Sequence, residues 1–225
     1  HRVDRRQRQM CIRGRHGSQA SNVACNECDL LIAVGCRFSD RVALQPDTFA
    51  SQAKIVHIDI DRSEIDKNVL TDHHIIGSAK RVLELLNERL PQYHHQSWKE
   101  HILPLREPQV VEEGDKLTPG QILDAIEKAV PRDAIVATDV GQHQMWSIQH
   151  FHFNYPGQLL TSGGFGTMGF GLGAAIGAKI GNPDKVVVHT TGDGCFRMNC
   201  HELATVEHYH LPIITVVFNL SLIHI

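Results

Sequence analysis

The chain has 225 residues, 42% of them hydrophobic and 21% charged, and a formal net charge of −3 at pH 7. This length suits one large domain or two small ones. The slightly acidic balance gives no electrostatic reason to expect binding to nucleic acid or to an anionic membrane. No apolar run approaches the roughly 20 residues of a membrane-spanning helix. The six cysteines are scattered, which favours reduced thiols in the cytoplasm.

The first 15 residues differ from the rest of the chain. They carry six arginines and no apolar core. We interpret residues 1–15 as an atypical end that is not native domain sequence.

Residues 16–91 alternate between strand and helix patterns. Short apolar runs at 30–36, 54–61 and 73–78 are typical of buried parallel strands. Residues 79–90 place their aliphatic side chains on one helical face. Residues 92–116 then lose all periodicity, and we expect a linker there.

Residues 117–225 form the second block. We expect Thr118 and Pro119 to be the N-cap and the first residue of a helix. Strands are expected within 134–140, 158–163, 185–194 and 212–219, and helices from Gln142, over 169–180 and from about Asn199. This alternation predicts parallel sheets covered on both faces. The expected fold class is α/β, with two doubly wound parallel-sheet blocks whose ligands bind at the carboxyl ends of strands.

Asp193 lies at one of these strand ends, between Gly192 and Gly194. Glycines let a bulky anion approach the backbone amides closely. A carboxylate there would repel a phosphate unless a cation lay between them, and Mg²⁺ or Ca²⁺ binds both kinds of oxygen. Asn219 ends the following strand and could contribute to the same metal site. A plain tight turn, with Asp193 capping the next helix, is the alternative.

A second motif competes with this interpretation. The segment GFGTMG at 164–169 fits the glycine pattern of Rossmann nucleotide sites, follows an apolar run and opens a helix. In that case the acidic residue should end the next strand and bind a ribose, and nothing would require Asn219.

Four segments in order resemble one enzyme family. Gly192-Asp193-Gly194 followed after 24 residues by Asn219 resembles the thiamine-diphosphate motif. The segments TSGGFGTMGFGLGAAIGAK, TDVGQHQMW and HGSQASNVACNECDLLIAVGCRFSDRV…KIVHIDIDRSEIDKNV are similar to those of acetolactate synthase (acetohydroxyacid synthase) large subunits. The resemblance runs from about His16 to Asn219.

The resemblance implies two cofactor-binding blocks. Residues 16–91 would be the second half of a central domain that binds FAD, and residues 117–225 a truncated domain that binds thiamine diphosphate and Mg²⁺. The implied metal ligands are Asp193 and Asn219. The implied thiamine-diphosphate residues are Gln142, His143, Gly166, Met168, Gly192, Gly194, Cys195 and Asn219. The implied FAD residues are Arg37, Asp40, Asp59 and Ile60.

The resemblance also implies the reaction. Acetolactate synthases condense two pyruvates, or pyruvate and 2-oxobutanoate, with loss of CO₂ in branched-chain amino acid synthesis. The expected partners are 2-oxo acid substrates, a second copy or more of the chain, and a small regulatory subunit.

Several positions depart from the family pattern. The activating glutamate belongs to a family domain that this sequence lacks, so no catalytic residue is assigned. Leu220 replaces the family's second asparagine, and residues 220–225 look atypical. Ser39 and Gly173 stand where the family usually shows aspartate and proline. We expect an internal fragment that is inactive alone.

Three alternatives stay open from the residues. The chain could derive from another thiamine-diphosphate decarboxylase, oxidase or carboligase. It could be a nucleotide-binding module that uses GFGTMG, or a structural remnant that only associates with homologous chains.

Overall fold

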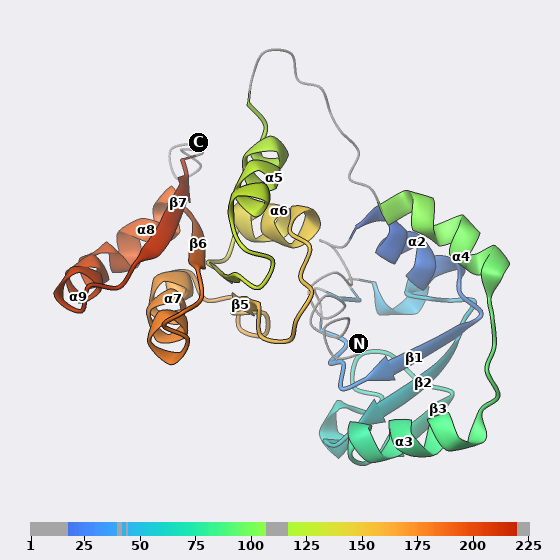
Figure 1. Cartoon of the computed structure of the whole chain (residues 1–225). Coiled ribbons are helices and arrows are strands. Elements are labelled where there is room, and N and C mark those ends of the chain that lie inside the picture. The colour runs from blue at the N-terminus through green and yellow to red at the C-terminus, as the bar shows by residue number, and fades with distance from the viewer. Residues whose placement is uncertain (1–17, 40–41, 44, 107–116, 220–225) are drawn as a thin grey trace. The chain divides into compact units, whose positions relative to one another are not determined.

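The computed structural model of the chain describes residues 18–39, 42–43, 45–106 and 117–219. They form two compact units, an N-terminal unit within residues 12–109 and a C-terminal unit within residues 110–225. Figure 1 shows the helices and strands of both. Among the described residues, no helix is long and apolar enough to cross a membrane.

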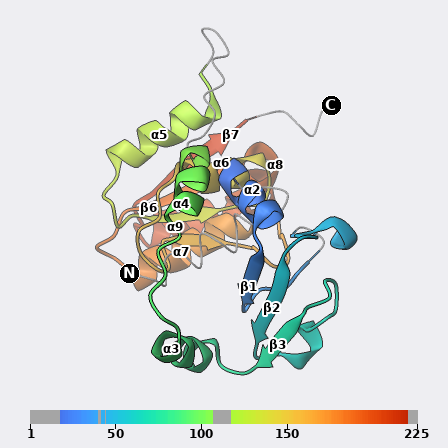
Figure 2. The same cartoon turned by 90° about the vertical axis from the view of Figure 1, so that its right-hand side faces the viewer.

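The N-terminal unit is built on a three-stranded parallel sheet in the order β1-β2-β3. Its strands are β1 (Leu30–Val34), β2 (Lys54–Asp59) and β3 (His73–Ile76), which Figure 2 shows side by side. Leu31 and Ala33 of β1 pack with Ile55 of β2. Among their described residues, the crossovers contain only the 3₁₀-helices Pro46–Thr48 and Arg62–Glu64. Loop residues therefore supply the rest of this core, namely Phe38, Ala43, Ala50 and Val69.

Helices border this sheet. Helix α2 (Gln19–Glu27) begins where the Ser18 hydroxyl accepts a hydrogen bond from the Ser21 backbone N–H, and helix α3 (Ala79–Arg89) follows β3 and contacts β2. A linker is predicted over 92–116, but helix α4 (Gln96–Ile102) and the 3₁₀-helix Leu103–Arg106 form there and contact α2. The linker prediction is therefore wrong for residues 96–106. Helix α4 is too short to show an amphipathic pattern, so the sequence pattern did not reveal it.

The C-terminal unit has a four-stranded parallel sheet in the order β5-β4-β6-β7. Its strands are β4 (Ile135–Thr138), β5 (Leu159–Thr161), β6 (Val187–Gly192) and β7 (Ile213–Phe218). The chain places β5 on one side of β4, and β6 and β7 on the other. The carboxyl ends of β4 and β6 therefore flank the point where the strand order reverses, where ligands bind in such sheets.

Helices cover both faces of this sheet. Helix α5 (Pro119–Ala129) begins at Pro119 after the N-cap Thr118, as predicted, and Thr118 forms a capping box with Gln121. Helix α6 (Gln142–His150) contacts β4 and β6, and helix α7 (Phe170–Gly181) contacts all four strands. Right-handed crossovers on either side of the reversal put α6 and α7 on opposite faces (Figure 1). The expected doubly wound arrangement is thus found in the C-terminal unit.

The segment after β6 differs from expectation. A helix is predicted from about Asn199, but helix α8 (Asp193–Asn199) already begins after Gly192, and helix α9 (Leu203–His208) follows a 3₁₀-turn. Asn199 separates the two helices. Its side chain donates a hydrogen bond to the Gly169 carbonyl, at 2.5 Å, and the α-helix ends at this residue. The helix start therefore lies directly at the strand end.

Candidate functional site

The carboxyl edge of the C-terminal sheet gathers most of the predicted residues. Thr138 of β4 pairs with Thr190 of β6, and Gly192 of β6 pairs with Phe218 of β7. The next residues along these strands, Asp139, Asp193 and Asn219, consequently leave the sheet at one edge. Parallel pairing makes Asp193 and Asn219 neighbouring positions on neighbouring strands.

Asp139 is the centre of a buried hydrogen-bond network at this edge. Its side chain is only 1% exposed. Oδ1 accepts from the Gly171 backbone N–H at 2.8 Å, and Oδ2 accepts from the Thr191 hydroxyl at 2.7 Å. The His189 Nε2 lies 3.1 Å from the same Oδ2. One carboxylate thus joins the end of β4, the end of β6 and the start of α7.

The electrostatics of Asp139 follow from these donors. Burial raises the pKa of its carboxyl, but the hydrogen bonds from His189, Gly171 and Thr191 outweigh burial, and the pKa is lowered overall. The carboxylate is therefore ionised at neutral pH. Its role is to fix the backbone on both sides of the strand reversal.

His143, in the first turn of α6, lies beside Gly192. A Cβ placed on Gly192 would come within 3.0 Å of His143 Nδ1. Burial lowers the pKa of the His143 imidazole, so the ring is neutral at pH 7. Its Nε2 is buried and has no hydrogen-bond partner among the described residues. A buried polar atom without a partner is costly, so this nitrogen marks a position that suits a polar ligand atom.

The glycine-rich turn between β5 and α7 borders the same edge. Gly166 has φ +71° and Gly169 has φ +84°, the left-handed region that glycine occupies without strain. A Cβ on Gly169 would also lie 2.8 Å from the Asn199 Nδ2. Met168 is 42% exposed and Phe165 is 94% exposed. Met168 is therefore available for contact with a ligand rather than packed in the core.

The remaining predicted residues of this unit surround the start of α8. Asp193 and Gly194 are half-buried in its first turn, and Cys195 is buried. The Cys195 thiol donates to the Val140 carbonyl at 3.3 Å, and burial raises its pKa, so it is a structural thiol. Gln142 and Asn219 are exposed. Within the described ranges, no three His, Cys, Asp or Glu side chains gather as a metal site, so a cation here would depend on mixed ligands.

The predicted residues of the N-terminal unit also lie at a carboxyl edge. The Gly35 N–H donates to the Ile58 carbonyl at 2.8 Å, which brings the segment after β1 next to the end of β2. Asp59 Oδ1 accepts from the Asp61 N–H at 2.9 Å. Arg37 is exposed, and Ile60 is 77% exposed. Asp40 lies outside the described residues.

Sequence reasoning missed part of this architecture. The sequence predicts a strand within 134–140, which ends at Asp139, but it assigns this aspartate no partners. His189, Thr191 and Gly171 come from segments 32 to 52 residues away from it. A run of polar residues that follows two valines inside a buried strand, as His189 to Thr191 do in β6, is the signal that could have found them.

Comparison with models of known protein families identifies the class of enzyme. Residues 139–221 match the family model described as "Thiamine pyrophosphate enzyme, C-terminal TPP binding domain". Residues 4–86 match "Thiamine pyrophosphate enzyme, central domain". The two blocks are thus a central and a C-terminal domain of a thiamine pyrophosphate enzyme.

Comparison with curated proteins identifies the family within this class of enzymes. The chain is 43% identical over 219 residues to the probable acetolactate synthase large subunit of Methanocaldococcus jannaschii, covering 92% of this chain and 37% of that one. It is 43% identical over 205 residues to the acetolactate synthase isozyme 2 large subunit of Escherichia coli, covering 89% and 36%. Acetolactate synthase 1, chloroplastic, of Nicotiana tabacum is 42% identical over 215 residues, covering 92% and 32%.

The chain therefore belongs to the acetolactate synthase large-subunit family, as its motifs indicated. It spans about a third of the length of the curated relatives it matches. The alternative interpretation, in which GFGTMG forms a Rossmann nucleotide site, does not hold. The sheet topology agrees, because GFGTMG follows β5, the edge strand, instead of a strand at the reversal point.

Proposed function

We propose that the carboxyl edge of the C-terminal sheet binds Mg²⁺ and the diphosphate of thiamine diphosphate within an acetolactate synthase large subunit. That enzyme condenses two pyruvates, or pyruvate and 2-oxobutanoate, with loss of CO₂ in the synthesis of branched-chain amino acids. The observation that carries the proposal is the buried Nε2 of His143, which has no partner among the described residues. It belongs to the imidazole that a Cβ on Gly192 would crowd.

The residues at this edge fit the cofactor. Asp193 and Asn219 offer carboxylate and amide oxygens, the ligands that Mg²⁺ prefers. The Gly194 and Cys195 amides belong to the first turn of α8, where backbone N–H groups have no partner inside the helix. These amides, with Gln142 and His143, would hold the diphosphate oxygens. Gly192 lacks a Cβ that would crowd them.

The turn before α7 would hold the other end of the cofactor. Met168 would lie under the rings, where its soft thioether adapts to an irregular surface. The Gly166 carbonyl would accept a hydrogen bond from the aminopyrimidine. Bound thiamine diphosphate supplies the electron sink that decarboxylation of a 2-oxo acid requires. The chain's own residues bind and orient it.

We further propose that the N-terminal unit contributes to FAD binding. Asp59 ends a parallel strand, the position at which an acidic side chain suits a ribose hydroxyl. Arg37 and Ile60 follow the neighbouring strand ends and are open to solvent. The sequence resemblance also assigns Asp40 to FAD binding.

We also propose that the subunit assembles into a homodimer or higher oligomer and with a small regulatory subunit, since the relatives are named large subunits. We propose a cytoplasmic location as well, because the scattered cysteines favour reduced thiols.

Calorimetric titration of thiamine diphosphate tests the cofactor site. We expect saturable binding that requires Mg²⁺, and we expect Asp193→Ala to weaken it more than about tenfold, the effect of ~1.4 kcal/mol. Asp184→Ala is the matched control, because Asp184 is exposed in the turn that precedes β6, at the opposite edge of the sheet. Equal binding by wild type and Asp193→Ala would contradict the proposal.

A further inference from the structure

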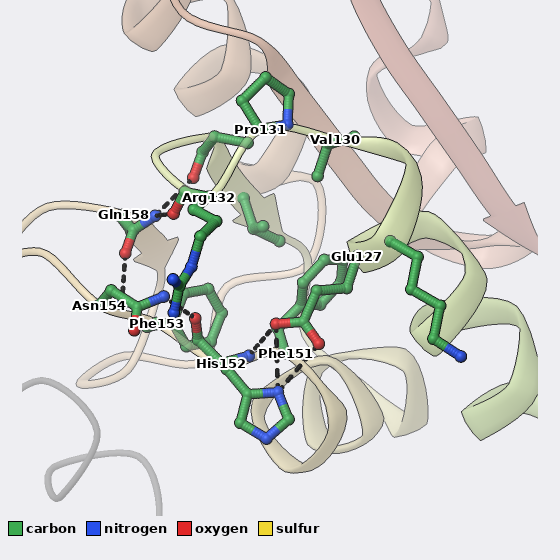
Figure 3. Close-up of a pocket in the computed structure, with 12 residues that line it drawn as sticks. Glu127, Val130, Pro131, Arg132, Phe151, His152, Phe153, Asn154 and Gln158 are labelled. Atoms are coloured by element: carbon green, nitrogen blue, oxygen red, sulfur yellow. Dashed lines mark hydrogen bonds and ion pairs between the residues drawn. The ribbon is translucent and has the colours of Figure 1, made fainter.

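A cavity lies at the opposite, amino-terminal edge of the C-terminal sheet. It has a volume of about 300 Å³, near the lower limit of small-molecule pockets in proteins. The end of α5, the turn before β4 and the segment that leads into β5 surround it (Figure 3). None of the residues expected to bind a cofactor lines it.

A buried amide fixes the shape of this cavity. Gln158 is 4% exposed. Its Oε1 accepts from the backbone N–H groups of Asn154 and Tyr155, at 2.5 and 2.7 Å. Its Nε2 donates to the carbonyls of Arg132, at 2.7 Å, and Ala134, at 3.1 Å. The two Nε2 bonds join the segment before β5 to the turn before β4, and the two Oε1 bonds fix the segment before β5 itself, so the cavity is preformed.

An acid–base pair forms another wall. The Glu127 carboxylate accepts from the His152 backbone N–H at 2.6 Å, and its two oxygens lie 3.2 and 2.9 Å from the His152 Nδ1. Figure 3 shows this carboxylate directed at the imidazole. The only acidic side chain that lines the cavity is therefore already engaged.

The two basic side chains of the cavity, in contrast, are not engaged by an acidic partner among the described residues. Arg132 and Lys128 line the cavity and are exposed. Within the described part of the chain, neither forms an ion pair. In Figure 3 the Arg132 side chain runs from its turn towards Phe153 and Asn154. These two cations, unpaired among the described residues, give the lining of the cavity an excess of positive charge.

The floor of the cavity is apolar. Phe151, Phe153 and Val136 line it and are each at most 6% exposed. Val130 and Pro131 add aliphatic surface at the rim. A ligand that fits must therefore combine a compact apolar body with one anionic group. A guanidinium binds a carboxylate with two parallel hydrogen bonds.

We propose that this cavity binds a small organic monocarboxylate, with its carboxylate on Arg132 and its apolar body against Phe151 and Val136. Lys128 adds charge without a fixed contact. The site does not depend on thiamine diphosphate, because it lies at the other edge of the sheet.

Phenylacetate is a suitable probe, followed by ¹H–¹⁵N spectra of the whole chain. We expect saturable shifts of the Lys128, Phe153 and Asn154 amides, and the same shifts in the absence of Mg²⁺ and thiamine diphosphate. Arg132→Gln should weaken binding roughly tenfold, as expected for loss of a charge-assisted hydrogen bond. Lys128→Gln should weaken it less. The control Arg89→Gln, in α3 of the N-terminal unit, should have no effect.

Neutral phenylacetamide is the matched control ligand. It keeps the shape of phenylacetate and removes the charge, so we expect it to bind at least about tenfold more weakly. Equal affinity for the two compounds would overturn the carboxylate assignment. Shifts confined to residues outside the cavity, or no shifts at all in a protein with well-dispersed spectra, would overturn the site.

Discussion

Replacement of Asp139 with alanine is expected to lower the free energy of unfolding of the C-terminal unit by about 3–5 kcal/mol. The substitution leaves the Gly171 N–H, the Thr191 hydroxyl and His189 without their acceptor. These groups are buried, so water cannot replace the lost bonds without opening the structure. Urea unfolding followed by Trp146 fluorescence measures the change, in a Trp98→Phe background that silences the other unit's tryptophan.

Asp139→Asn should cost less, about 1–2 kcal/mol. The asparagine amide keeps one oxygen acceptor, and His189 can present a lone pair at Nε2 by moving its proton to Nδ1. That nitrogen is buried without a partner among the described residues, which is why the cost is not zero. Asp133→Ala, at an exposed position, is the control. A loss below about 1 kcal/mol in Asp139→Ala would mean that the network does not support the fold.

The same carboxylate gives an acid dependence with a definite sign. The pKa of Asp139 is lowered from 3.8 in the folded state, so its contribution to stability is present above the unfolded value and disappears as the pH falls through the folded pKa. The stability gap between wild type and Asp139→Asn should therefore be constant from pH 7 to about 5 and narrow below about 4.

Gly171→Ala should destabilise the C-terminal unit by about 1–3 kcal/mol or more. An added Cβ would lie 2.7 Å from His189 Nε2 and 2.9 Å from both the backbone N and the Oδ2 of Asp139. None of these atoms is the end of a flexible side chain, so the start of α7 has to move away from β4. Thermal or urea unfolding of the purified variant measures the loss.

Gly173→Ala, two residues further along α7, is the matched comparison. Apart from the neighbouring residues and the backbone of the helix itself, no atom of the described residues lies within 4 Å of a Cβ at that position. Alanine there should raise stability by about 0.5–1 kcal/mol, because glycine is costly inside a helix. Similar effects at both positions would show that α7 does not approach β4 as closely as the structure has it.

Most of the framework could be predicted from the sequence. Short apolar runs such as those around Ile135 and Val187 marked the strands, because both faces of a parallel sheet are buried. Thr118 and Pro119 marked a helix start whose capping box is present. The strand ends then located the candidate site residues, since all strands of a parallel sheet end on the same side.

The rest depends on contacts that no local pattern encodes. The short helix α4 has too few turns for a periodic stripe. The break between α8 and α9 lies at Asn199, whose side chain donates a hydrogen bond to the Gly169 carbonyl, 30 residues away. The partners of Asp139 lie on two other elements. A pattern can place a carboxylate at a strand end, but only the folded chain decides which donors surround it.

The most direct test of the cofactor proposal is the ¹⁵N signal of the His143 imidazole, assigned by its loss in His143→Gln. Because the ring bonds the Asp139 backbone and Nε2 is the nitrogen without a partner in the described structure, Nε2 carries the lone pair. A diphosphate oxygen accepts hydrogen bonds, so Nε2 is expected to take up a proton and shift when Mg²⁺ and thiamine diphosphate are added. Thiamine diphosphate binding that leaves this signal unchanged would contradict the site described here.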